Sequence, residues 1–429
     1  MPIITNLSTS WILDSRAIPT IFCQVTIDEK NYKYTGQASV PSGASTGKHE
    51  ALELRDGRKA FGGKGVDKAI DNILNKIGPK ILGQEFTTAK DLDELVLSFE
   101  KSLTPDGVDP SLKTALGANA ILGVSMAAHR AFASFEEVEL WEYLRALYFD
   151  KLGQTATFPR LMCNIFNGGA HANNGLAIQE FMVVPHTGNL QKDVQTASEI
   201  YNQLKNDIKE NGQSVAVGDE GGFAPKFANT EKVLDKICTA IEESGYDRSA
   251  CDISLDCAAS EFFDSVKNIY TLDETEFDRT KLNDKYYDWN EKYQFLSIED
   301  AFAEDDLLGW SIITSKLGKK LTLIGDDLFV TNPKRFSELA IDKKLANGVL
   351  VKPNQIGSIL ETCELINLAI DNNYTTAISH RSGETNDTFI ADLAVACKSE
   401  FIKLGAPARG ERTAKYNRLL EIWEMEQNR

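Results

Sequence analysis

The sequence has few cysteines, and their pattern excludes a disulfide or zinc framework. The seven cysteines are odd in number and widely scattered, and no two of them form a C-x-x-C pair. Scattered, unpaired thiols are typical of proteins that stay in a reducing compartment. We therefore expect reduced cysteines and a cytoplasmic location.

The chain also lacks an excess of positive charge and any segment suited to a membrane. Its 46 basic and 63 acidic residues give a formal net charge of −17, which repels nucleic acid and anionic lipid. The N-terminus shows no basic start followed by an apolar core, so no secretory signal is visible. The most apolar stretch, residues 116–133, contains Asn119, His129 and Arg130, which indicates a buried helix. We expect no nucleic-acid partner and no membrane partner.

Several common catalytic motifs are absent as well. No G-x-G-x-x-G follows an expected strand, and no H-E-x-x-H pair occurs. No motif therefore supports a dinucleotide-binding or zinc-protease function. The segment Gly43–Lys48 resembles a phosphate-binding P-loop, but only three residues separate its glycines, and His49 stands where Ser or Thr is needed. His129 lies in an apolar stretch and is predicted to be a core residue.

The 429 residues are long enough for two domains, which we place at residues 1–140 and 141–429. The first region begins with alternating strand-like runs, TIFCQVTI and YKYTGQASV, and its pattern becomes helical from about Glu50. This order predicts an N-terminal α+β capping domain.

The second region is predicted to be a β/α barrel of the TIM type. It opens with two short apolar strands, LMCNIF and EFMVVP, and two helices follow at 190–210 and 230–244. Short apolar strands that end in polar residues then recur roughly every 25 to 30 residues, the length of one βα unit. The expected order is ββαα followed by (βα)6, within the α/β class.

Charged residues stand at the ends of these strands, where barrel enzymes place their chemistry. Three acids come first along the chain, and three cationic positions follow. They are Asp256, Glu299 and Asp326, then Lys352, His380 with Arg381, and Lys403. A single acid there could be a solvated strand end, but three in succession, without thiolates or clustered imidazoles, favour Mg²⁺.

The same ends supply candidate acid–base and phosphate-binding groups. Lys352 follows an apolar strand, where burial and nearby metal charge would lower its pKa toward that of a base, although a lysine before proline is often a surface residue. Arg381 and Ser382 suit a phosphate, although a polar turn would read the same way. Glu180 or Glu220 could serve as general acid if burial keeps the carboxyl protonated. Together these groups suggest removal of a proton next to a carboxylate.

The sequence resembles the enolases from Ile12 to about Glu421, and the enolase superfamily uses this combination of groups. The matching segments, in order, are LDSR (13–16), VPSGASTGKHEALELRD (40–56), LGANAILGVSMA (116–127), NGGAH (167–171), QEFM (179–182), GDEGGFAP (218–225), LDCAASEF (255–262), SIED (297–300), FAEDD (302–306), GDDLFVTNP (325–333), KPNQIG (352–357), SHRSGETNDTFIADLAV (379–395) and GAPARGERTAKYN (405–417).

The resemblance implies Mg²⁺-dependent dehydration of 2-phosphoglycerate to phosphoenolpyruvate, with two magnesium ions in each site. The implied metal ligands are Asp256, Glu299 and Asp326 for the first ion and Ser42 for the second. The implied catalytic groups are Lys352 as base at C2, Glu220 as acid at the C3 hydroxyl, and Glu180 beside it. The implied substrate-binding residues are Arg381 and Ser382 for the phosphate, Lys403 for the carboxylate, and His171, Gln179 and His380 around the pocket.

The chain departs from the family pattern near these residues. Enolases usually read DSRGNP, HADN, IKTGAP and RSER where this chain has Ala17–Ile18, Asn173, Leu404 and Gly410. Ser10 and Phe22 replace charged residues, so we expect a homodimer that is weaker than the family norm or arranged differently. Two alternatives remain open: a paralogue acting on a related phosphorylated or phosphonate acid, and a non-catalytic binding protein. The intact acid–base set argues against the second.

Overall fold

The computed structural model describes residues 1–43 and 47–429. Ala44, Ser45 and Thr46 lie outside the described residues, so part of the 40–56 segment and of the P-loop-like stretch is untested. In the described part of the chain, no helix combines the length and apolarity that a membrane crossing requires.

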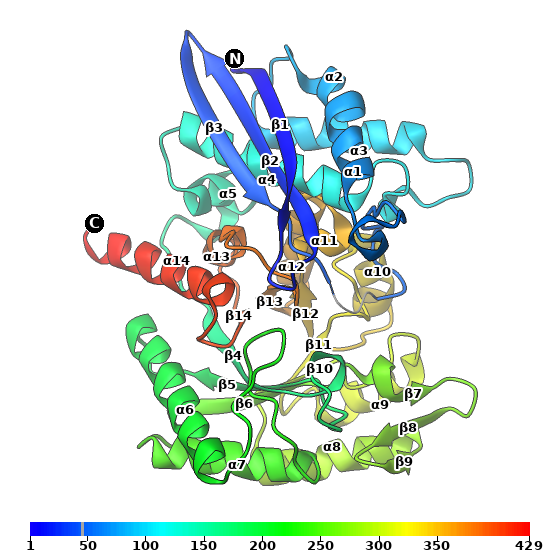
Figure 1. The fold of residues 1–429 in the computed structure, drawn as a ribbon, viewed down its shortest axis with the longest axis vertical. Helices are drawn as coiled ribbons and strands as arrows, with labels where there is room; N and C mark the ends of the chain where they lie inside the picture. The colour runs from blue at the N-terminus through cyan, green and yellow to red at the C-terminus, as the bar shows by residue number, and fades with distance from the viewer. Residues whose placement is uncertain (44–46) are drawn as a thin grey trace.

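The N-terminal part is an antiparallel three-stranded sheet packed against helices, as predicted (Figure 1). The sheet consists of β1 (Ile3–Leu13), β2 (Pro19–Glu29) and β3 (Tyr32–Ser39). The helices are α1 (Asp67–Asn72), α2 (Gly78–Ile81), α3 (Ala89–Leu103), α4 (Ala118–Phe135) and α5 (Leu140–Tyr148). Helix α4 covers β2 and β3 and is almost wholly buried, which confirms the buried helix predicted at 116–133. His129 is buried within it, as predicted for a core residue.

The prediction that helix begins near Glu50 is wrong. The segment after Glu50 is irregular, and the first α-helix begins at Asp67. Its backbone bonds distant parts of the chain instead of its own next turn: Ala51 N donates to Gln355 O at 2.8 Å, and Leu52 N donates to Leu112 O at 2.8 Å. Tertiary hydrogen bonds thus satisfy the backbone groups that a helix would otherwise pair.

The second part is a closed eight-stranded barrel. Its strands are β4 (Arg160–Asn167), β5 (Glu180–Pro185), β6 (Cys251–Asp256), β10 (Ser297–Glu299), β11 (Thr322–Gly325), β12 (Gly348–Val351), β13 (Thr375–Ser379) and β14 (Phe401–Gly405). Strand β5 is antiparallel to both neighbours, and the other pairs are parallel. The predicted ββαα(βα)6 order is confirmed.

Helices surround this barrel between and after the strands (Figure 1). They are α6 (Leu190–Glu210), α7 (Thr230–Glu243), α8 (Arg279–Tyr293), α9 (Leu307–Leu317), α10 (Pro333–Phe336), α11 (Pro353–Ile356), α12 (Ile359–Asp371), α13 (Phe389–Ala396) and α14 (Gly410–Gln427). A small sheet of β7 (Phe263–Asp264), β8 (Ile269–Leu272) and β9 (Thr275–Phe277) precedes α8. This insertion explains why the interval between β6 and β10 is longer than one βα unit.

The barrel interior divides into an apolar layer and a charged layer. Met182, Ile324, Leu350 and Phe401 belong to a buried apolar cluster of their own. Because strand side chains alternate between two faces, residues two positions away point to the same side of the strand. Those positions are Glu180, Asp326, Lys352 and Lys403. The fold therefore stacks the charged residues on an apolar floor inside the barrel.

Candidate active site

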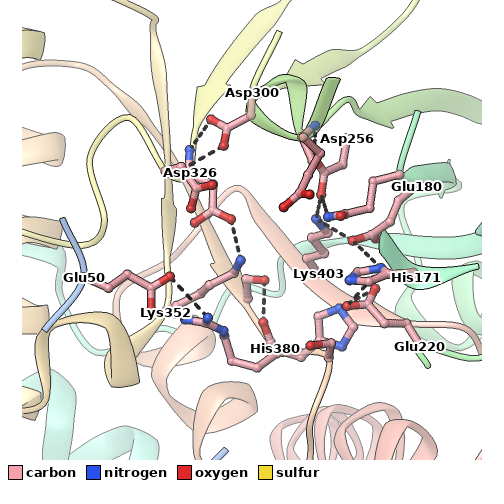
Figure 2. Close-up of a pocket in the computed structure, with 17 residues that line it drawn as sticks. Glu50, His171, Glu180, Glu220, Asp256, Asp300, Asp326, Lys352, His380 and Lys403 are labelled. Carbon is pink, nitrogen blue, oxygen red and sulfur yellow. Dashed lines mark hydrogen bonds and ion pairs between the residues drawn. The ribbon is translucent and has the colours of Figure 1, made fainter. Parts of the chain in front are cut away.

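A pocket opens at the end of the barrel where the parallel strands finish (Figure 2). Most of the predicted site residues line it, including residues far apart in sequence. They are His171, Gln179, Glu180, Glu220, Asp256, Asp326, Lys352, His380, Arg381, Ser382 and Lys403. Glu299 is buried beneath them and contacts Lys403, while Ser42 does not line the pocket.

Lys403 lies at the centre of a buried group of carboxylates. Its Nζ is 2.8 Å from Asp256 Oδ2, 3.0 Å from Glu299 Oε1 and 3.1 Å from Glu180 Oε1. Burial lowers the pKa of Lys403, but these acids outweigh burial and hold the pKa well above its usual value. Lys403 stands in the middle of β14, paired with Ser379 and Met162, and not at the strand end as predicted. It reaches the acids because its side chain points into the barrel.

Lys352 follows β12 directly and forms a short ion pair with Asp326. Asp326 also accepts a hydrogen bond from Gln355 Nε2 at 2.8 Å. Burial lowers the pKa of Lys352, but the carboxylate of Asp326 outweighs it, so the pKa is raised. The lowering predicted from the sequence depends on metal charge beside Lys352 and stays a prediction.

Two acids and two histidines form the opposite wall of the pocket. His171 Nδ1 is 3.9 Å from Glu180 Oε1 and 3.8 Å from Glu220 Oε1. Burial and the charge of Glu220 raise the pKa of Glu180 well above its usual range. For Glu220, the raising effect of burial is outweighed by His380, His171 and Arg412, and the pKa falls well below its usual range. The two pKa shifts run in opposite directions, so Glu180 takes up a proton more readily than Glu220.

Arg412 fixes the orientation of the His380 ring. Arg412 Nη1 donates to His380 Nδ1 at 2.6 Å. Because a guanidinium can only donate, Nδ1 accepts, and the ring proton sits on Nε2. That nitrogen faces Glu220 Oε2 at 3.3 Å. Arg412 thus positions an N–H toward the carboxylate of Glu220, and this interaction favours the ionised acid.

The predicted phosphate-binding residues lie at the seam between the two parts of the chain. Arg381 makes a two-point ion pair with Glu50, with Nη1 at 3.0 Å from Oε2 and Nη2 at 3.2 Å from Oε1. Ser382 Oγ accepts from Arg16 Nη1 at 3.3 Å. Ser42 Oγ donates to the carboxylate of Asp14 at 2.9 Å and accepts from Arg16. Arg16 therefore joins Ser42 to Ser382 in one network.

The buried acids suit a hard divalent cation. Asp256 and Glu299 are register partners on adjacent parallel strands, so their carboxylates point to the same end of the barrel. Asp326 belongs to a second group with Asp300 and Asp327, whose ligand oxygens lie within 4.8 Å of one another. Burial, and after it the negative charge of Asp256, raises the pKa of the Glu299 carboxyl well above its usual range. Oxygen-only donors in a buried group of carboxylates that repel one another fit a metal ion.

Sequence reasoning missed five residues that shape this site. Glu50 and Asp327 line the pocket, Gln355 bonds Asp326, and Arg412 orients His380. Asp300 directly follows Glu299, and its carboxylate accepts the backbone N–H groups of Asp326 and Asp327, each at 2.9 Å. All of these residues lie in the segments that resemble enolases. Apart from that resemblance, the only sequence feature that pointed to any of them was the pair of adjacent acids in SIED and in GDD.

The fold and the site define a class: a β/α-barrel enzyme with a capping domain, whose buried carboxylates and lysines suit a metal ion and a small anionic substrate. Matches to protein-family models identify a narrower group within this class. The model described as "Enolase, N-terminal domain" matches residues 4–144, and "Enolase, C-terminal TIM barrel domain" matches residues 155–428.

Relatives named "Enolase" are similar over almost the whole chain. The protein from Elusimicrobium minutum is 48% identical, with 96% of this chain and 93% of the relative aligned. Those from Bdellovibrio bacteriovorus and a Nitratiruptor species are 47% and 46% identical, with 96% and 98% of this chain and 94% and 96% of the relatives aligned. The chain belongs to the enolase family.

Proposed function

We propose that this protein catalyses the reversible dehydration of 2-phospho-D-glycerate to phosphoenolpyruvate, a step of glycolysis and gluconeogenesis. One observation carries the proposal: a largely buried lysine and a buried pair of glutamates face the same pocket from opposite sides (Figure 2). Lys352 comes from the end of β12, and Glu180 and Glu220 come from β5 and the loop after α6. Such a pair can act on two different atoms of one small substrate.

In this reaction Lys352 takes the proton from C2 of the substrate, and the C3 hydroxyl then leaves as water with a proton that the Glu180–Glu220 pair supplies through Glu220. Glu180 lies beside Glu220 across His171, and its raised pKa lets the pair keep one proton. The His380 N–H toward Glu220 holds this carboxyl in place for the second step. Lys352 thus acts at the C2–H bond of the substrate, and Glu220 acts at the C3–O bond.

The cofactor we propose is Mg²⁺, with two ions in each site. Asp256, Glu299 and Asp326 would hold the first ion, and Ser42 would hold the second together with substrate phosphate. Divalent cations supply positive charge that stabilises the negative charge developing on the substrate carboxylate. The oxygen-only donor set and the repulsion between the carboxylates of Asp256 and Glu299 support this choice.

The substrate would be held mainly by cationic and polar groups. Arg381 and Ser382 would bind the phosphate, and Lys403 the carboxylate, because a guanidinium fork and a hydroxyl suit a phosphate and an ammonium suits a carboxylate. His171, Gln179 and His380 would complete the pocket. Gln179 Oε1 and His171 Nδ1 are buried and lack a hydrogen-bond partner among the described residues, which supports a role in binding a ligand.

The remaining features of the proposal concern the whole chain. We assign residues 1–140 to a capping domain and 141–429 to the catalytic barrel. The protein would work in the cytoplasm, since all seven cysteines are free. It would form a weakened homodimer, because Ser10 and Phe22, register partners on β1 and β2, replace charged residues of the family pattern.

The test is a direct assay of the purified protein with 2-phosphoglycerate and Mg²⁺. We expect ultraviolet absorbance to rise as the enol product forms, to stop on addition of a chelator, and to resume with Mg²⁺. Product formation that continues in chelator would contradict the metal proposal. Absence of product at high enzyme concentration would contradict the proposed substrate.

A further inference from the structure

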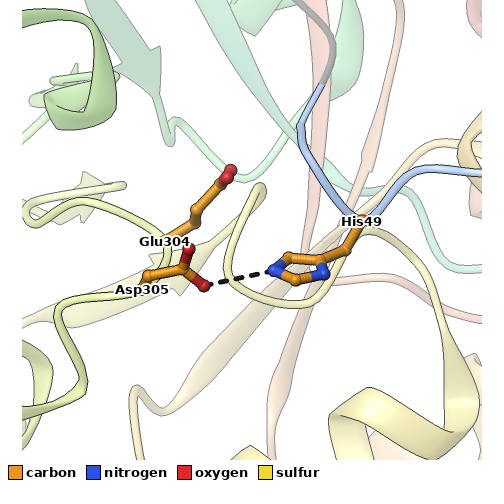
Figure 3. Close-up of side chains that lie close together, drawn as sticks. All are labelled: His49, Glu304 and Asp305. Carbon is orange, nitrogen blue, oxygen red and sulfur yellow. Dashed lines mark hydrogen bonds and ion pairs between the residues drawn. The ribbon is translucent and has the colours of Figure 1, made fainter.

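Figure 3 shows a cluster of candidate metal ligands, which does not belong to the lining of the catalytic pocket. It forms where the turn at residues 47–50 meets the loop after β10. His49, Glu304 and Asp305 each offer one ligand atom, and these atoms lie within 4.8 Å of one another. None of the three lines the catalytic pocket. The cluster therefore needs an explanation other than the proposed reaction.

The spacing of the two best-placed ligands suits a bound ion. His49 Nε2 lies 3.1 Å from Asp305 Oδ1 (Figure 3). Zinc sits about 2.0 to 2.2 Å from nitrogen and oxygen ligands, so two ligands of a tetrahedral ion are about 3.3 Å apart. The pair is thus within a few tenths of an ångström of the spacing that coordination requires.

The ammonium group of Lys48 already pairs with one acid of this cluster. Lys48 Nζ lies 3.0 Å from Asp305 Oδ2, although Lys48 and Asp305 are 67% and 55% exposed. Burial and the charge of Asp305 also raise the pKa of the Glu304 carboxyl. Two neighbouring acids therefore repel each other and attract positive charge. Lys48 supplies part of this charge and would compete with a metal ion for Asp305.

The donor set indicates which ion would bind. One imidazole and two carboxylates suit zinc and similar transition-metal ions, whereas Mg²⁺ prefers oxygen ligands alone. We propose that His49, Glu304 and Asp305 form a transition-metal site, of the Zn²⁺ class, that fastens the 47–50 turn of the N-terminal part to the barrel. The same turn carries Glu50, which holds Arg381 in the catalytic pocket.

The site can be tested by titrating the full-length, Mg²⁺-saturated protein with Zn²⁺ and following the histidine side chains by NMR. The chain has only five histidines, so each ring can be assigned by substitution. We expect the His49 signals to shift as zinc is added up to one equivalent. His171 and His380 line the catalytic pocket and would report separately any zinc that displaces Mg²⁺. Unchanged His49 signals would overturn the proposal.

Substitution of the ligands and substitution of Lys48 should change the affinity for zinc in opposite directions. His49→Gln and Asp305→Asn should each weaken zinc binding by at least about tenfold, the loss seen even for partners of metal ligands, and Lys48→Met should tighten it. The control is His186→Gln, because His186 is similarly exposed and lies 3.3 Å from one acid, Asp252; it should bind zinc like the unaltered protein. Zinc binding that persists in His49→Gln, or is unchanged in Lys48→Met, would overturn the proposal.

Discussion

At the scale of single residues, the pocket pairs buried charges that would be costly to leave alone. Lys403 contacts Glu180, Asp256 and Glu299, and Lys352 contacts Asp326. A buried charge is tolerated only when it is paired and hydrogen-bonded. These two lysines face four acids, and burial together with the charge of Asp256 raises the pKa of Glu299. Further positive charge beside these acids would therefore stabilise the arrangement.

Substitution of the two proposed catalytic groups should separate the halves of the reaction. Lys352→Ala should abolish both product formation and exchange of the C2 proton with deuterated solvent, because Lys352 removes that proton. Glu220→Gln should keep the exchange while product formation falls by roughly 10² to 10⁴, the usual contribution of a positioned acid or base. Proton exchange is measured by NMR, and product by absorbance.

Glu180→Gln is the necessary companion in this experiment. Glu180 and Glu220 share His171 at 3.9 and 3.8 Å and titrate as a pair. A loss in Glu180→Gln that matches the loss in Glu220→Gln would show that the pair acts as one unit. Exchange that persists undiminished in Lys352→Ala would show that the base is wrongly assigned.

At the scale of elements, the strand ends were predictable and the segments that cross between domains were not. Asp256 ends a short apolar strand, Asp326 and Lys352 directly follow one, and the barrel brings successive strand ends together. The sequence showed which strand contains Lys403 but not that Lys403 lies in the middle of that strand. An apolar run does not show where a strand ends. The register of β14 with β13 settles this position.

Glu50 could not be placed from the sequence, for a related reason. It was expected at the start of a helix, but the segment that follows it bonds the barrel and the N-terminal helices. Such hydrogen bonds depend on how distant parts dock, and local periodicity carries no information about them. The role of Arg412 could not be predicted for the same reason, because it depends on the position of His380.

The contact between Glu50 and Arg381 should tune substrate affinity more than the chemical step. Glu50→Gln removes the charge that fixes the guanidinium, and a hydrogen bond to a charged group contributes about 1.5 to 3 kcal/mol. We expect KM for 2-phosphoglycerate to rise roughly ten- to hundredfold with little change in kcat, because the phosphate is not a reacting group. Steady-state kinetics measures both.

Glu276→Gln is a control for that variant. Glu276 is exposed and does not line the pocket. Its KM should stay close to that of the unaltered protein. A fall in kcat that exceeds the rise in KM for Glu50→Gln would assign Glu50 to the chemistry and refute a positioning role.

At the scale of the whole molecule, a buried acid joins the N-terminal helices to the barrel. Asp93 on α3 accepts hydrogen bonds from Ser125 Oγ at 2.7 Å and from Leu360 N at 3.1 Å. Leu360 lies in the first turn of α12, so Asp93 caps a barrel helix from the other part of the chain. Glu361 lies nearby and opposes its ionisation. This contact ties the stability of the assembled molecule to the protonation of one side chain.

The pH dependence of stability follows from the pKa of Asp93. Burial raises that pKa from 3.8 to about 7, so the folded protein keeps a proton that the unfolded chain loses. Stability from this group is complete below pH 4 and falls as pH rises toward 7, by on the order of 4 kcal/mol. Asp93→Asn should remove this part of the pH dependence. Urea unfolding of both proteins between pH 5 and pH 8 measures it, with the exposed neighbour Glu94→Gln as control. Parallel curves for Asp93→Asn and the unaltered protein would refute the assignment.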